Sequence, residues 1–151
     1  MSDPEKALAS ADLLLVLHDV SNKFMRKSLS QKILRLLHLY PDKESILVLN
    51  KIDLLKEKRL LLDLAARLSE GIIGGQMLNQ PLDASRKRHK QISPVPAPSV
   101  ESQFLSEKEV TKRIEGKIGW PQFSSVFMIS AIDGDGVTEI EVNTLQIHIP
   151  I

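Results

Sequence analysis

Short, continuous apolar runs constrain the fold of this chain more than any other feature. They lie at residues 12–17 and 46–49, and a third segment, 124–129, becomes apolar after Ser124 and Ser125. Runs of this length, without polar and apolar alternation, are typical of strands that a parallel sheet buries on both faces. A leucine-rich stretch with helical spacing lies between the first two runs, at 29–37, and another follows the second run, at 54–69. Alternating strands and helices imply right-handed crossovers. We therefore predict an α/β fold with a mostly parallel sheet and three recognisable strands.

Local signals place the ends of the two predicted helices. Ser28 or Ser30 can cap the start of the 29–37 helix, and Pro41 prevents its continuation. Gly71 fits the C-terminal cap of the 54–69 helix. We expect His18 and Asp19 to begin a loop that leaves the first strand.

A polar tetrapeptide, Asn50-Lys51-Ile52-Asp53, directly follows the second run. At the carboxyl end of a parallel strand the chain enters the crevice where open α/β folds bind ligands. The Asp53 carboxylate there can accept hydrogen bonds from guanine N1–H and its exocyclic amine. The Asn50 amide can serve O6 and N7, and the Lys51 stem can cover the ring. The sequence is similar to the Asn-Lys-x-Asp motif with which G domains recognise guanine.

A simpler interpretation exists for the same residues. Asn50 could cap a following helix, Lys51 could be solvated, and Asp53 could be an acid at a helix N-terminus. A second signal favours guanine, because the third run leads directly into Ser130-Ala131. In G domains the backbone N–H groups of such a pair meet guanine O6. The predicted guanine-binding residues are therefore Asn50, Lys51, Asp53, Ser130 and Ala131.

Composition places the chain among small single domains. Its 151 residues are 42% hydrophobic with a formal net charge of +1. Cysteine is absent, which excludes disulfides and thiolate metal sites. The histidines lack ligand spacing, so we predict no metal site among His18, His38, His89 and His148. No stretch approaches the roughly 20 apolar residues of a membrane span, and no targeting sequence is recognisable.

Residues 72–117 change in composition, with many glycines and prolines and little periodicity. We predict a long flexible insertion, largely disordered. It contains a candidate RNA contact at Arg86, Lys87, Arg88 and Lys90. Such a cluster can bind phosphates by releasing counterions. A solvated charge run is the favoured interpretation, because no aromatic residues interleave with the cluster to stack on bases.

Several segments together resemble the Era-like GTPases, in particular the mitochondrial members of animals. They are residues 10–21, 47–53, 68–71 and 118–131. The most particular is Gly119-Trp120-Pro121-Gln122-Phe123. The resemblance implies a GTP- and GDP-binding protein that binds small-subunit ribosomal RNA near its 3′ end and assists ribosome assembly. It also implies a mitochondrial location, in the matrix or associated with the inner membrane.

The chain departs from the family at its front. A Walker A loop, Gly-x-x-x-x-Gly-Lys-Ser/Thr, occurs nowhere in the 151 residues. The family pattern would place that loop, the magnesium ligand and the switch regions before residue 1. We therefore expect residues 1–141 to form the carboxyl-terminal half of a P-loop-NTPase-like G domain in a truncated chain. Nucleotide binding should be weak, and we predict no catalytic residue and no magnesium ligand, so GTPase activity rests on the resemblance alone.

The chain also departs from the family at its rear. The family's RNA-binding KH domain does not follow, and Asp133-Gly134-Asp135-Gly136 is predicted to be a turn. Residues 142–151 form a divergent tail whose apolar residues alternate: Val142, Leu145, Ile147, Ile149 and Ile151. Without a phosphate-loop strand beside it, the 12–17 strand should expose an apolar edge. The alternative function is therefore an interaction fragment that binds protein or RNA through this edge or the basic cluster.

Overall fold

The computed structural model describes residues 4–78 and 106–148. The elements are α1 (Pro4–Ser10), β1 (Leu13–Asp19), α2 (Gln31–Leu39), β2 (Glu44–Asn50), the 3-10 helix η1 (Ile52–Leu54), α3 (Arg59–Leu68), β3 (Ile72–Ile73), β4 (Gln76–Met77), α4 (Glu107–Ile114), β5 (Phe123–Met128) and α5 (Val137–His148). None of the described helices is long and apolar enough to cross a membrane.

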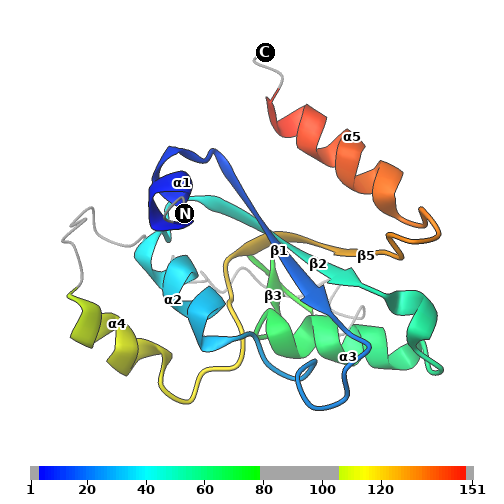
Figure 1. The fold of residues 1–151 in the computed structure, drawn as a ribbon, viewed down its shortest axis with the longest axis horizontal. Coiled ribbons are helices and arrows are strands. Elements are labelled where there is room, and N and C mark those ends of the chain that lie inside the picture. The colour runs from blue at the N-terminus through cyan, green and yellow to red at the C-terminus, as the bar shows by residue number, and fades with distance from the viewer. Residues whose placement is uncertain (1–3, 79–105, 149–151) are drawn as a thin grey trace, which may run out of the picture.

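The main sheet has the order β1-β2-β5, and both pairings are parallel. Leu17 of β1 lies opposite Val48 of β2, and Val48 lies opposite Phe127 of β5. The three arrows in Figure 1 accordingly point the same way. The prediction of an α/β fold with a parallel sheet and three recognisable strands is confirmed. The same topology brings the carboxyl ends of all three strands to one end of the sheet.

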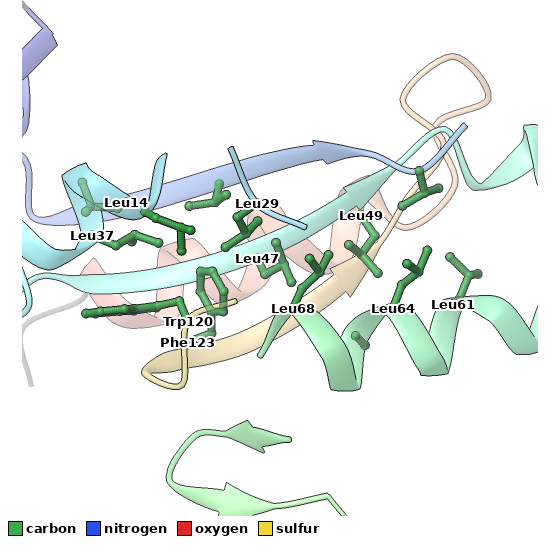
Figure 2. Close-up of a cluster of buried hydrophobic side chains, with 14 of the residues drawn as sticks. Leu14, Leu29, Leu37, Leu47, Leu49, Leu61, Leu64, Leu68, Trp120 and Phe123 are labelled. Carbon is green, nitrogen blue, oxygen red and sulfur yellow. The ribbon is translucent and has the colours of Figure 1, made fainter. Parts of the chain in front are cut away.

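Helices cover the two faces of this sheet unequally (Figure 1). On one face α2 and α3 enclose the main core, whose members include Leu14, Leu47, Leu49, Phe123, Leu34, Leu37, Leu61, Leu64 and Leu68. Figure 2 shows the α3 leucines and Trp120 among these side chains. On the other face Ile46, Val48 and Ile129 pack with Val137 and Ile140 of α5. Because β2 is central, its residues 45–49 are buried on both faces, as the apolar run predicted. The same prediction is wrong for β1, whose residues alternate between buried and exposed, and for β5, which is mostly half-buried.

The outer edge of β1 is exposed. In the described part of the chain β1 pairs with β2 alone. Leu15 and Leu17 are 45% and 59% exposed, and alternation places them on the face that α5 covers only in part. The predicted apolar edge is therefore present. His18 and Asp19, expected in a loop, instead end the strand, because the β1–β2 ladder continues to the Asp19–Asn50 pair.

Both ends of the predicted 72–117 insertion belong to the fold, which corrects its boundaries. The β3–β4 hairpin docks on β5 through a 2.8 Å bond from Gly74 N–H to the Phe123 carbonyl. Helix α4 begins with a capping box between Ser106 and Glu109, and it buries Val110 and Ile114. Two apolar residues in eight gave too weak a periodicity to predict this helix. The basic cluster lies outside the described residues, as does the rest of 79–105.

The structure also tests the predictions for the tail, for the 54–69 helix and for the cap of α2. Residues Val142–His148 belong to α5, so the alternating pattern predicted for this part of the tail is wrong. The i, i+3 pair Val137 and Ile140 packs on the sheet and favours the helix over an extended tail. The 54–69 helix begins only at Arg59, because η1 forms a separate turn first. Ser30 is the predicted cap of α2, and its hydroxyl accepts from Ile33 N–H.

Candidate guanine-binding site

The candidate site is formed where β1, β2 and β5 end. Asn50 is the last residue of β2, and η1 follows it with Asp53. Ser130 and Ala131 come directly after Ile129, just beyond β5. Since the strands are parallel and neighbouring, their carboxyl ends bring these residues together. Lys51, Asp53 and Ala131 are exposed, so their polar atoms are accessible from solvent.

Asn50 links the two strand ends through its side chain. Its Oδ1 accepts hydrogen bonds from Lys51 N–H at 2.8 Å and from Ala131 N–H at 3.2 Å. Both acceptor directions of Oδ1 are thereby used, so the Nδ2 amide is the part of this side chain that could donate to a ligand. The helix-cap interpretation of Asn50 is not supported, because Lys51 is the residue that precedes η1 and no side chain caps that helix.

Lys51 adopts an unusual backbone conformation beside this junction. Its φ of 65° and ψ of 37° lie in the left-handed region, which residues other than glycine seldom adopt. Its Nζ donates to Asp19 Oδ2 at 2.6 Å. The side chain is therefore drawn across the strand ends toward β1. Strained conformations of this kind cluster at ligand sites.

Asp19 was not among the predicted site residues. Its Oδ1 accepts from Ser21 N–H at 2.8 Å and from the Ser21 hydroxyl at 2.6 Å. The bond from Lys51, with smaller contributions from Ser21, lowers the pKa of Asp19 from 3.8 to about 2. The sequence signal that could have found it is its place at the end of the first strand, level with Asn50 in the β1–β2 register.

Ser130 acts through its side chain. The residue is 1% exposed, and its hydroxyl oxygen lies 2.9 Å from Asp53 Oδ1 and 3.0 Å from Asp133 Oδ2. A hydroxyl has one proton, so it donates to one carboxylate at a time. Its backbone N–H donates to the Asp135 carbonyl at 3.0 Å and is not available to a base, contrary to the prediction. Ser130 therefore positions Asp53.

The remaining predictions for this edge can be compared with the structure. The turn predicted at 133–136 begins earlier, at 131, and Asp135 within it forms a bridge with Ser130. The turn places Asp133 beside Ser130. His18 Nε2 bonds the Arg26 carbonyl and His38 Nδ1 bonds the Leu34 carbonyl, so both histidines hold the backbone. Among the described residues no group of three or more acidic or histidine side chains could hold a metal ion.

A parallel sheet with these residues at the ends of β2 and β5 has the arrangement of part of a P-loop G domain. The mitochondrial GTPase Era of Danio rerio is 40% identical over 150 residues, which cover 92% of this chain and 32% of that protein. The Salmo salar protein of the same name is 32% identical over 93% of this chain and 35% of its own length. The Caenorhabditis elegans one is 30% identical over 97% and 42%.

No model of a protein family matches the chain. All three relatives carry the same name, and each aligns with more than nine tenths of the chain. The chain belongs to the Era-like GTPase family, and it spans about a third to two fifths of the length of these curated relatives.

Proposed function

We propose that this chain recognises the guanine base of GTP and GDP. The observation that carries the proposal is the pair of bonds that joins the two strand ends, from Ala131 N–H to Asn50 Oδ1 and from the Ser130 hydroxyl to Asp53 Oδ1. These partners are 81 and 77 positions apart in the sequence. The fold thus brings two motifs that are distant in the sequence into contact with each other.

Asp53 reads the base edge in this proposal. With Oδ1 oriented by Ser130, the carboxylate keeps acceptor capacity for guanine N1–H and the exocyclic amine. Charge-assisted bonds of this kind contribute roughly 1.5 to 3 kcal/mol each. Adenine presents no matching donor pair, so it would cover the Asp53 carboxylate without pairing it, which disfavours adenine.

Asn50, Lys51 and Ala131 complete the pocket. The Nδ2 protons of Asn50 donate to guanine O6 and N7, while Ala131 N–H keeps its bond to Asn50 Oδ1 and holds that amide in place. The stem of Lys51 covers one face of the ring. For this its ammonium must leave Asp19 or stay bonded to it across the base, and the exposure of both side chains, 45% and 44%, permits either position.

Affinity for the whole nucleotide should be low. Phosphate contacts supply much of the binding energy in proteins that hold nucleotides at a helix N-terminus, and the 151 residues contain no Walker A sequence. Phosphoryl transfer requires a positioned metal, a lysine and an attacking water. We therefore assign these residues base recognition and no catalytic step.

The relatives' names extend the proposal to the protein's setting. The three similar proteins are named as mitochondrial GTPases, so we place this chain in the mitochondrion. By family resemblance its larger role is in assembly of the small ribosomal subunit through ribosomal RNA.

Equilibrium binding of a fluorescent GDP analogue tests the proposal. Binding should be displaced by GDP and unaffected by excess ATP, and Asp53→Ala should weaken it strongly. Asp63→Ala is the matched control, because Asp63 is an exposed carboxylate of α3 away from the strand ends. Equal displacement by ATP and GDP, or unchanged binding by Asp53→Ala, would overturn the assignment.

A second function is favoured by one observation, the uncovered edge of β1. Together with α1 and α2 this strand lines an apolar hollow of about 360 Å³, which includes Leu15 and Leu17. An extended segment of a protein partner could add a strand at this edge. Binding of a protein partner that is lost on replacing Leu15 and Leu17, with no nucleotide binding, would favour this function.

A further inference from the structure

A second exposed feature lies between β1 and α2, in the segment 21–28, which we name the Phe24 loop. It is the blue loop that descends from the tip of β1 at the lower edge of Figure 1. Phe24 is 93% exposed and Met25 is 64% exposed. The proposed guanine pocket uses neither side chain.

The exposure of Phe24 is built into an ordered backbone. Asn22 Oδ1 accepts from Phe24 N–H at 3.0 Å and from Met25 N–H at 3.3 Å. Arg26 N–H donates to the Asn22 carbonyl at 3.0 Å, and the Arg26 carbonyl is bonded by the His18 ring at 2.9 Å. The loop is thus tied to itself and to β1 while its aromatic ring points into solvent.

Buried residues fix both ends of the loop. Val20 is fully buried before it and Leu29 is 2% exposed after it. Leu29 N–H also donates to the Ile118 carbonyl at 2.8 Å. A rigid loop that exposes a ring in this way is preorganised for a partner.

The charge of the loop defines the partner's chemistry. Lys23, Arg26 and Lys27 flank Phe24, and residues 20–30 contain no acidic residue. None of these three cations forms an ion pair within the described part of the chain. Asp19, at the base of the loop, is already bonded to Lys51. The loop therefore presents an unneutralised positive charge around one exposed ring.

We propose that the Phe24 loop binds single-stranded nucleic acid, with the Phe24 ring stacked on one base and Lys23 and Lys27 on the flanking phosphates. Stacking needs a single exposed ring and tolerates any base, and cations beside it follow the backbone. The loop is less suited to insertion into a membrane, because one phenylalanine and one methionine bury little apolar area. Stable membrane anchoring needs a larger apolar area.

This inference goes beyond the guanine pocket and does not depend on it. The basic cluster at 86–90 offers charge without an aromatic residue. The loop and the cluster can be separated by assaying every variant also in a background in which Arg86, Lys87, Arg88 and Lys90 are replaced by glutamine.

The test is fluorescence anisotropy with a labelled oligouridine RNA of about 12 nucleotides, a length within the range that single-strand binders cover. Phe24→Ala should weaken binding about tenfold. Phe24→Trp should retain binding and show quenching of the new indole on RNA addition, which reports stacking directly. Leu62→Ala is the matched control, since Leu62 is 68% exposed on α3, and it should bind as the unmodified chain does.

Salt dependence tests the two lysines. Lys23→Gln and Lys27→Gln should each reduce the slope of log K against log salt by about 0.7. Lys56→Gln, which alters an exposed lysine after η1, should leave the slope unchanged. An unchanged slope in both loop variants would remove the phosphate contacts and contradict the proposal.

Three further results would overturn the proposal. They are the absence of RNA binding, equal binding by Phe24→Ala, and Phe24-dependent binding to vesicles containing phosphatidylserine without binding to RNA. GDP binding is measured on the same preparations. Retained GDP binding with any of these results leaves the guanine assignment intact and rejects the loop assignment alone.

Discussion

Replacing Gly119 with alanine tests how closely the segment before β5 approaches α3. A Cβ at Gly119 would lie 2.5 Å from the Leu68 carbonyl oxygen and 2.7 Å from that of Arg67. Both neighbours are backbone at the end of a helix, so they cannot rotate away. The variant must separate the segment from α3 and stretch the 2.8 Å bond from Trp120 N–H to the Leu68 carbonyl.

The magnitude follows from two contributions. Overpacking a dense core costs about 1 to 3 kcal/mol, and a weakened buried hydrogen bond adds about 1 kcal/mol. We expect Gly119→Ala to lower the free energy of unfolding by about 3 kcal/mol. Trp120 is 5% exposed and is the sole tryptophan of the chain, so its fluorescence in a urea titration reports this region.

Gly116→Ala is the control. Gly116 has a φ of +74° but no atom within 4 Å of its would-be Cβ. Alanine there costs about 1 to 2 kcal/mol of backbone strain. Close approach should therefore outweigh the left-handed conformation. The reasoning is refuted if Gly119→Ala shifts the urea midpoint, at equal slope, by no more than Gly116→Ala does.

Three other predictions concern charge, burial and the sheet edge. Because the folded pKa of Asp19 is lowered to about 2, its bond to Lys51 stabilises the fold above pH 3.8 and is lost as the pH falls toward 2. The stability of Asp19→Asn, followed by circular dichroism, should therefore depend less on pH in this range than that of the unmodified chain. Burial lowers the pKa of His38 below 6.5, so the neutral ring stabilises the fold at higher pH and this stabilisation is lost on acidification. The thermal midpoint of His38→Gln should therefore depend less on pH than that of the unmodified chain. An equal dependence in both proteins would contradict the role of His38 burial. Lysines at Leu15 and Leu17 should reduce self-association in sedimentation velocity without unfolding the chain, whereas unchanged association would show that this edge is not the contact.

The sequence was sufficient for the sheet and for the position of the site. A strand buried on both faces needs a continuous apolar run, so β2 was visible without any long-range information. Polar residues immediately after such runs can only lie at the carboxyl edge, which placed Asn50, Asp53 and Ser130 together. These signals are local, because burial and strand direction can be inferred from the order of apolar and polar residues along the chain.

Other features depended on partners distant in the sequence. Asp19 belongs to the candidate site because Lys51, 32 positions later, bonds it. Ser130 acts through its hydroxyl because its backbone donor is taken by the Asp135 carbonyl. Helix α4 is stabilised by packing on α2, including a 2.9 Å bond from Arg35 to Glu107, more than by its own periodicity. No local pattern encodes these contacts.

Binding of GDP and of inosine diphosphate to the unmodified chain and to Asp53→Ala tests the central claim most directly. Hypoxanthine lacks only the exocyclic amine, so it removes one of the two hydrogen bonds assigned to Asp53. We predict that the unmodified chain prefers GDP about tenfold or more, and that Asp53→Ala, assayed at concentrations high enough to detect its residual binding, shows no preference. An equal preference in both proteins, or none in the unmodified chain, would contradict recognition of guanine by Asp53.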